Sequence, residues 1–83
     1  MRVERLPFGM FAPSGSDFIR IERAQEGQIA LSGLVMRDRS KLNYIAVFQT
    51  QGEAEQAGLS WAGHHGAERV FVEVLFDQSA GGT

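Results

Sequence analysis

Two neighbouring histidines, His64 and His65, are the side chains whose type most directly suits metal or acid-base chemistry. They lie between Gly63 and Gly66, just ahead of the most apolar segment of the chain. Adjacent residues point about 100° apart on a helix and to opposite faces of a strand, so the two imidazoles cannot easily share one ion. Zinc sites need three or four ligands, yet there is no cysteine, no third histidine and only Glu68 nearby. We therefore expect no metal and no cofactor, and we interpret the pair as an exposed turn at a helix end.

Nucleophilic catalysis has no better support in the sequence. None of the serines stands in a G-x-S-x-G motif or in another context that would place a nucleophile. The glycine-containing stretches at 14–16 and 63–66 are not phosphate-binding loops, because no Lys-Ser or Lys-Thr pair follows them. The sequence thus predicts a protein that is not an enzyme.

Three basic residues, Arg37, Arg39 and Lys41, form a cluster with Asp38 among them. At a hairpin tip, three cations can reach a phosphate backbone or an acidic protein surface, and arginine adds bidentate hydrogen bonds. The simpler alternative is a solvated turn. Aromatic residues do not alternate with these cations, so the stacking platform of a single-strand binder is missing.

A second candidate contact region is apolar. Phe8, Met10 and Phe11 lie in an irregular amino-terminal segment that holds both prolines, Pro7 and Pro13. A fully solvated loop would rarely carry three such side chains. Either the loop folds over an open face of the core, or it is exposed for recognition, because contiguous apolar surface usually marks an interface.

Composition narrows the class of protein. The 83 residues include 10 acidic and 8 basic side chains, for a formal charge of −2, whereas proteins that coat nucleic acid carry a surplus of Lys and Arg. The absence of cysteine excludes disulfides and thiolate chemistry. The amino terminus is charged rather than apolar, unlike a signal peptide, and no segment is apolar for long enough to span a membrane. We expect a cytoplasmic protein without membrane association.

Hydrophobic periodicity predicts four long strands and one helix. Alternating residues indicate strands at 18–24, 28–36, 43–50 and 68–76, with a short edge strand at 2–6. Glu26 and Gly27 predict one hairpin turn, and the polar segment 37–43 predicts the next connection.

The helix is predicted to start at Gln51, because Thr50 and Glu53 form a T-x-x-E capping box. Gly63 is expected to end it in the left-handed conformation, with Gly66 as a second permissive joint. The expected apolar side consists of small residues and one large anchor: Ala54, Ala57, Gly58 and Trp61. The expected solvent-facing residues are Glu53, Glu55 and Gln56.

These elements predict a two-layer α+β domain over residues 1–76, followed by a flexible tail at 77–83. The order β-β-β-α-β gives a mixed, mostly antiparallel four-stranded sheet with the helix packed on one face. The last strand should run parallel to the third and lie beside either the third or the first. Because one helix covers only part of such a sheet, the second face must be covered by the loop at 8–11, a second copy or a partner.

The leading interpretation is a small non-enzymatic binding protein that occupies the surface of a protein or ribonucleoprotein partner. Its contact residues would be those of both candidate regions: Arg37, Arg39, Lys41, Phe8, Met10 and Phe11. A short, acidic, cysteine-free domain would suit an inhibitor carried by a phage or mobile element, such as an anti-CRISPR protein. The alternatives are a nucleic-acid-binding module that uses the Arg37/Arg39/Lys41 tip, and an enzyme or metal protein centred on His64 and His65. With any of these functions, the second sheet face could also form a homodimer.

Overall fold

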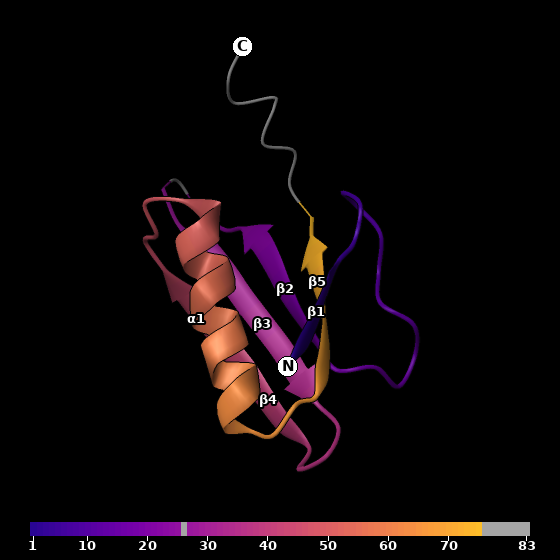
Figure 1. Ribbon diagram of the computed structural model, residues 1–83. Coiled ribbons are helices and arrows are strands. Elements are labelled where there is room, and N and C mark those ends of the chain that lie inside the picture. The colour runs from indigo at the N-terminus through magenta and orange to yellow at the C-terminus, as the bar shows by residue number, and fades with distance from the viewer. Residues whose placement is uncertain (26, 76–83) are drawn as a thin grey trace.

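The computed structural model describes residues 1–25 and 27–75, which form a five-stranded sheet with one helix packed on it (Figure 1). Its elements are β1 (Arg2–Arg5), β2 (Phe18–Arg23), β3 (Ile29–Val35), β4 (Ser40–Ala46), α1 (Gln51–His64) and β5 (Arg69–Val74). The predicted two-layer α+β fold is confirmed. The sheet has five strands rather than four because the short amino-terminal strand joins it. The predicted tail at 77–83 lies outside the described residues.

The strand order is β1-β5-β2-β3-β4. The strands β2, β3 and β4 form an antiparallel meander, and β5 enters between β1 and β2, parallel to both. Of the two positions open to the last strand, it therefore takes the one beside the first long strand. This placement makes β5 and β2 interior strands, which explains why both carry apolar residues on their two faces.

The strand predicted at 43–50 begins earlier, at Ser40, and ends at Ala46. A tight turn makes this possible: Arg39 N–H donates to Met36 O at 3.3 Å, and Asp38 Oδ1 accepts from Ser40 N–H at 3.1 Å. Arg39 takes the left-handed conformation, with φ of 57°. Lys41 consequently lies within β4 and not at the hairpin tip.

The start of α1 is as predicted. Thr50 Oγ1 accepts from Glu53 N–H at 3.1 Å, and the Glu53 carboxylate reaches back to Gln49 N–H at 3.4 Å, one residue before the cap. The buried stripe is rotated from the predicted one, because Ala57 is exposed and Trp61 only partly buried. Its members are Ala54, Glu55, Gly58, Leu59 and Ala62.

Glycine lets the helix approach the sheet closely. A Cβ at Gly58 would lie 2.7 Å from Ile19 Cδ1, and one at Gly33 would lie 3.0 Å from Trp61 Cζ3. Trp61 thus rests on β3 at a position without a side chain. The core between the layers is formed by aliphatic residues of β2, β3 and β5, namely Ile19, Ile21, Leu31, Val35, Val70 and Val72.

The helix ends later than predicted, with Gly66 rather than Gly63 as the left-handed residue that follows it. It continues through Gly63 to His64, and Gly66 is the residue with a positive φ, +80°. Ala67 N–H donates to Ala62 O and Gly66 N–H donates to Gly63 O, each at 3.1 Å, which is the Schellman arrangement. The prediction that Gly63 terminates the helix is therefore wrong, because the left-handed residue must follow the cap, His65.

Substitution of the two glycines by alanine should have opposite effects. Gly63→Ala is expected to raise the free energy of unfolding by about 0.5 to 1 kcal/mol, because Gly63 is helical and a Cβ there would meet nothing within 4 Å. Gly66→Ala should lower it by about 1 kcal/mol or more, because alanine is strained at positive φ. Urea unfolding of both variants measures the difference; equal effects would contradict this helix end.

Candidate functional site

The histidine pair divides into one exposed and one engaged side chain. His64 is exposed on the last turn of α1. His65 Nδ1 lies 2.8 Å from Asp38 Oδ2 and 2.9 Å from Ser40 Oγ, and its ring is 5.0 Å from that of Trp61. His65 therefore ties the β3–β4 turn to the end of the helix.

This cluster contains a serine, a histidine and an aspartate, but its geometry is not that of a catalytic relay. A relay needs the serine at one ring nitrogen and the carboxylate at the other. Here Asp38 and Ser40 both approach Nδ1, which carries at most one proton. Ser40 thus has no separate base, and the cluster serves to fix the turn. Among residues 1–25 and 27–75, no group of three or more His, Cys, Asp or Glu side chains could hold a metal ion.

The turn cluster predicts a pH-dependent stability. Hydrogen bonds from His65, and then from Ser40, lower the pKa of Asp38. A carboxyl with a lowered folded pKa stabilises the fold above its unfolded pKa of about 3.9, and this contribution is lost as the pH falls through the folded pKa. Asp38→Asn should therefore lower the urea midpoint at pH 7, with a gap to wild type that closes in strong acid. A gap that is the same at pH 7 and in strong acid would contradict this.

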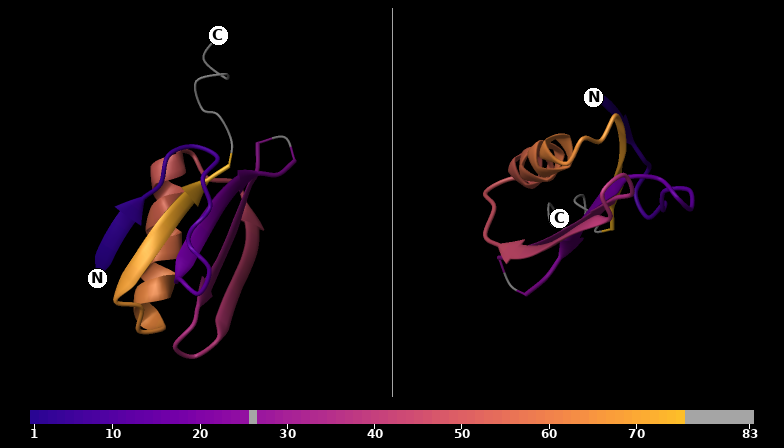
Figure 2. Two further views of the ribbon diagram at one scale, coloured as in Figure 1. Left: turned by 90° about the vertical axis from the view of Figure 1, so that its right-hand side faces the viewer. Right: turned by 90° about the horizontal axis from the view of Figure 1, so that it is seen from below.

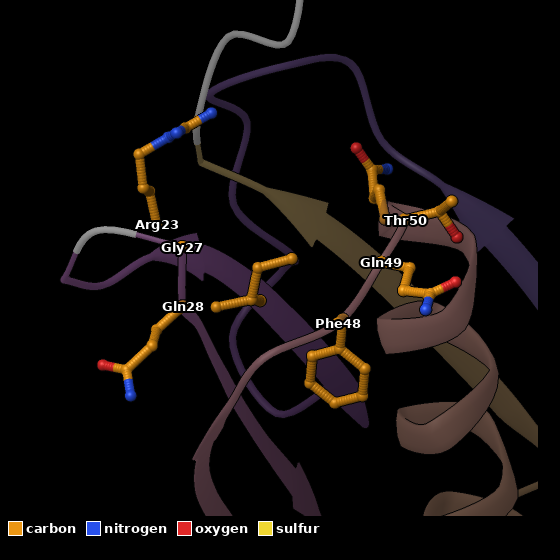
Figure 3. A pocket seen from close by; sticks show the side chains of 8 residues that line it. Arg23, Gly27, Gln28, Phe48, Gln49 and Thr50 are labelled. Carbon is orange, nitrogen blue, oxygen red and sulfur yellow. The ribbon is translucent and has the colours of Figure 1, made fainter.

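A shallow hollow lies between the β2–β3 turn and the start of α1 (Figure 3). Its volume is about 270 Å³, below the range of about 300 to 1,000 Å³ that is typical of small-molecule sites. Among the described residues that line it, Arg23 is the one charged side chain, and amide side chains such as Gln28 and Gln49 predominate. Its described lining residues do not include the paired titratable groups that acid-base chemistry needs.

The sheet face opposite α1, named the open face here, is the larger candidate surface. Because Ile19, Leu31 and Val72 point to the helix, their neighbours in sequence point the other way. Two rows of side chains cross this face by register. One row is Phe71, Phe18, Leu34 and Lys41; the next is Glu73, Arg20, Ser32 and Asn43.

The amino-terminal loop covers part of the open face. In Figure 2 the segment between β1 and β2 runs along β5 and β2 on the side away from α1. Glu73 holds it there: Oε2 accepts from Ala12 N–H at 2.6 Å, and Oε1 accepts from Arg20 Nε at 2.6 Å. The Arg20 guanidinium lies 5.1 Å from the ring centres of both Phe11 and Phe18. A buried carboxylate therefore anchors both the loop and the cation between two aromatic rings.

Glu73 was not among the predicted site residues. Its side chain is 2% exposed, and that of Arg20 is 30% exposed. The signal was available in the sequence: a glutamate in the apolar run 68–76 and an arginine in the strand 18–24, each needing a partner once buried. Because the two residues are 53 positions apart in the sequence, no local pattern predicts that they pair.

The amino-terminal loop first continues the β1–β5 pairing, as Gly9 N–H donates to Val74 O at 3.0 Å, and then folds over the sheet at Ala12, but its large side chains stay exposed. The exposed fractions of Phe8, Met10 and Phe11 are 61%, 50% and 59%. Its role in recognition stays a prediction.

Comparison of the chain with protein-family models, curated proteins and solved structures finds no match. Among the described residues, no helix is long and apolar enough to cross a membrane. Function is therefore inferred from the site itself.

The structure does not bring the three predicted cations together. Arg37 Nη1 donates to Gly66 O at 3.4 Å and lies 3.8 Å from Glu68 Oε1, near the end of α1. Lys41 is opposite Leu34 and belongs to the open face, while Arg39 occupies the turn. The Arg37/Arg39/Lys41 cluster of the sequence is thus spread over two sides of the molecule.

Proposed function

We propose that this is a non-enzymatic binding protein that covers part of a partner protein's surface with its open face. The observation that carries the proposal is the exposure of large apolar side chains at three places on the open face. Phe11, next to Arg20 of β2, is 59% exposed; Met36, just beyond the end of β3, is 46% exposed; and Ile45, near the end of β4, is 56% exposed. Several large apolar side chains exposed on one face of a small domain point to an interaction surface.

The open face combines apolar and polar side chains. Partly buried Phe18 and Leu34 form an apolar row at one end of β2 and β3, and the next row, Arg20, Ser32 and Asn43, is polar. Surfaces that bind other proteins commonly mix the two in this way. The amino-terminal loop adds Phe11, whose ring packs against the Arg20 guanidinium. A preorganised aromatic ring is the kind of side chain that dominates binding energy.

The charges favour a protein partner over a nucleic acid. Arg20 is neutralised by Glu73, Arg37 faces Glu68, and the chain carries a net charge of −2. Binding to a phosphate backbone depends on several free cations on one surface. The nucleic-acid alternative would use Arg37, Arg39 and Lys41, which do not share a face. A narrower form of the proposal, an inhibitor of a ribonucleoprotein such as an anti-CRISPR protein, draws support only from chain size and composition.

A pair of charge substitutions tests the proposed surface. Met36→Glu/Ile45→Glu places two carboxylates on the open face, and the matched control Ala57→Glu/Ser60→Glu places two on the exposed side of α1. Partners are captured from a nuclease-treated host extract with each tagged protein, purified, and titrated by calorimetry.

The open-face variant should bind its partner about 30-fold more weakly than wild type or more, the size of a typical hot-spot loss, and the control should bind normally. Equal affinity of both variants would refute the proposed surface. Capture from an untreated extract that is absent from the nuclease-treated one would support the nucleic-acid alternative instead.

A further inference from the structure

The two edges of the sheet differ in how they are protected against pairing. The β1 edge has four residues, of which Arg2, Glu4 and Arg5 are charged. The β4 edge has seven residues, of which only Lys41 is charged, and its register with β3 is unbroken from Ser40 to Ala46. Natural edge strands avoid association by being short, charged, bulged or interrupted by proline. The β1 edge is protected in two of these ways, and the β4 edge in almost none.

Apolar side chains flank the unprotected edge. Tyr44 and Ile45 are 54% and 56% exposed, and Val47, just beyond β4, is 73% exposed. The helix packs mainly over β3, β2 and β5, so it covers the helix-side face of β4 only in part: Leu42 packs against the core, but Tyr44 stays exposed. Figure 2 shows β4 as the outermost strand, with α1 lying over the body of the sheet. Alternate residues of an edge strand also direct N–H and C=O groups outward, where another strand can pair with them.

We propose that β4 pairs antiparallel with β4 of a second copy of this chain, about a two-fold axis at Asn43. Asn43 is the midpoint of Ser40–Ala46, so this register pairs all seven residues of the strand. It sets Leu42 opposite Tyr44 of the second copy on the helix side. It sets Lys41 opposite Ile45 of the second copy on the open-face side, so the one charged residue never meets itself.

The pairing extends the sheet across both copies. Because the axis is perpendicular to the sheet, both helices lie on the same side and the two open faces become one continuous surface. The inference does not depend on the proposed function, since edge pairing holds whether or not a partner occupies the open face. The Ile45→Glu substitution used above would face Lys41 of the second copy, so loss of partner binding and loss of pairing remain separable.

A single cysteine tests both the pairing and its register. The chain has no cysteine, so Asn43→Cys introduces one thiol at the axis, and Gln56→Cys introduces one on the exposed side of α1 as a control. Directly opposed residues of antiparallel strands have Cα atoms about 4.5 to 5.5 Å apart, within disulfide range. Under mild oxidation, Asn43→Cys should form disulfide dimers at least tenfold faster than the control, and the wild type should sediment as a dimer at about 100 µM.

Asn43→Lys gives an independent readout, because two lysines would face each other at the axis. The Asn43→Lys dimer should dissociate at protein concentrations at least tenfold higher than the wild-type dimer does. The Gln56→Lys dimer should dissociate at the same concentrations as the wild type. A wild type that sediments as a monomer at about 100 µM overturns the proposal. A wild-type dimer in which Asn43→Cys cross-links no faster than Gln56→Cys also overturns it, because the copies then meet elsewhere. Pairing of β4 with a strand of another protein, in a chain that stays monomeric alone, overturns the choice of a second copy.

Discussion

Glu73→Ala is expected to lower the free energy of unfolding by about 3 to 5 kcal/mol. The Glu73 side chain is 2% exposed, and its two oxygens accept from Arg20 Nε and Ala12 N–H. Removing the carboxylate leaves a cation and a backbone donor without their partner on the covered part of the sheet. Total stabilities of about 5 to 15 kcal/mol are usual for domains, so this variant should be close to unfolding.

Glu73→Gln should cost less, because the amide oxygen can still accept from Ala12 N–H. The control is Glu68→Ala, since the Glu68 side chain is 91% exposed and its nearest cation, Arg37, is 3.8 Å away. Urea unfolding followed by circular dichroism orders the three variants. If Glu73→Ala and Glu68→Ala had the same midpoint, the buried ion pair would not be what holds the loop on the open face.

Ile19→Ala is the second substitution with a large expected effect, about 3 to 5 kcal/mol. Ile19 is fully buried, and its Cδ1 lies 2.7 Å from the position that a Cβ on Gly58 would take. The helix has no side chain at that point with which to fill the space, so the cavity should persist.

The same geometry predicts that Gly58→Ala changes the stability in opposite directions with and without the Ile19 side chain. Gly58→Ala alone should destabilise the protein by about 1 to 3 kcal/mol through overpacking, although alanine favours the helix. In the Ile19→Ala background, Gly58→Ala should instead raise stability, because the methyl group occupies the cavity. A double-mutant cycle measures this coupling; strictly additive effects would mean that Gly58 does not face Ile19.

Local sequence patterns were sufficient to predict where the helix starts and how the helix and sheet layers are arranged. Thr50 and Glu53 form their contacts within one turn, and alternation placed β2, β3 and β5 to within a residue or two. The start of β4 was missed because Ser40 and Lys41 are polar. An edge strand solvates such side chains, so polarity there does not indicate a turn.

The long-range ion pairs could not be predicted from local pattern. Glu55 was expected to face water, but Arg5 donates to its two oxygens at 3.0 and 2.7 Å, from 50 residues away. Glu73 and Arg20 meet in the same way across adjacent strands. The need to cover a second sheet face was inferred from apolar residues on both sides of the strands. Which atoms hold the covering loop emerges only from the register of β5 beside β2.

Site-specific photocross-linking can show whether the open face is the surface that contacts the partner. A photoreactive phenylalanine analogue is placed at Ile45 on the open face or at Ala57 on the exposed side of α1, and each protein is irradiated in host extract. Binding through the open face predicts a discrete protein adduct, distinct in mass from the dimer of this chain, from position 45 and none from position 57. Adducts from position 57 alone, or the same adducts from both positions, would contradict it.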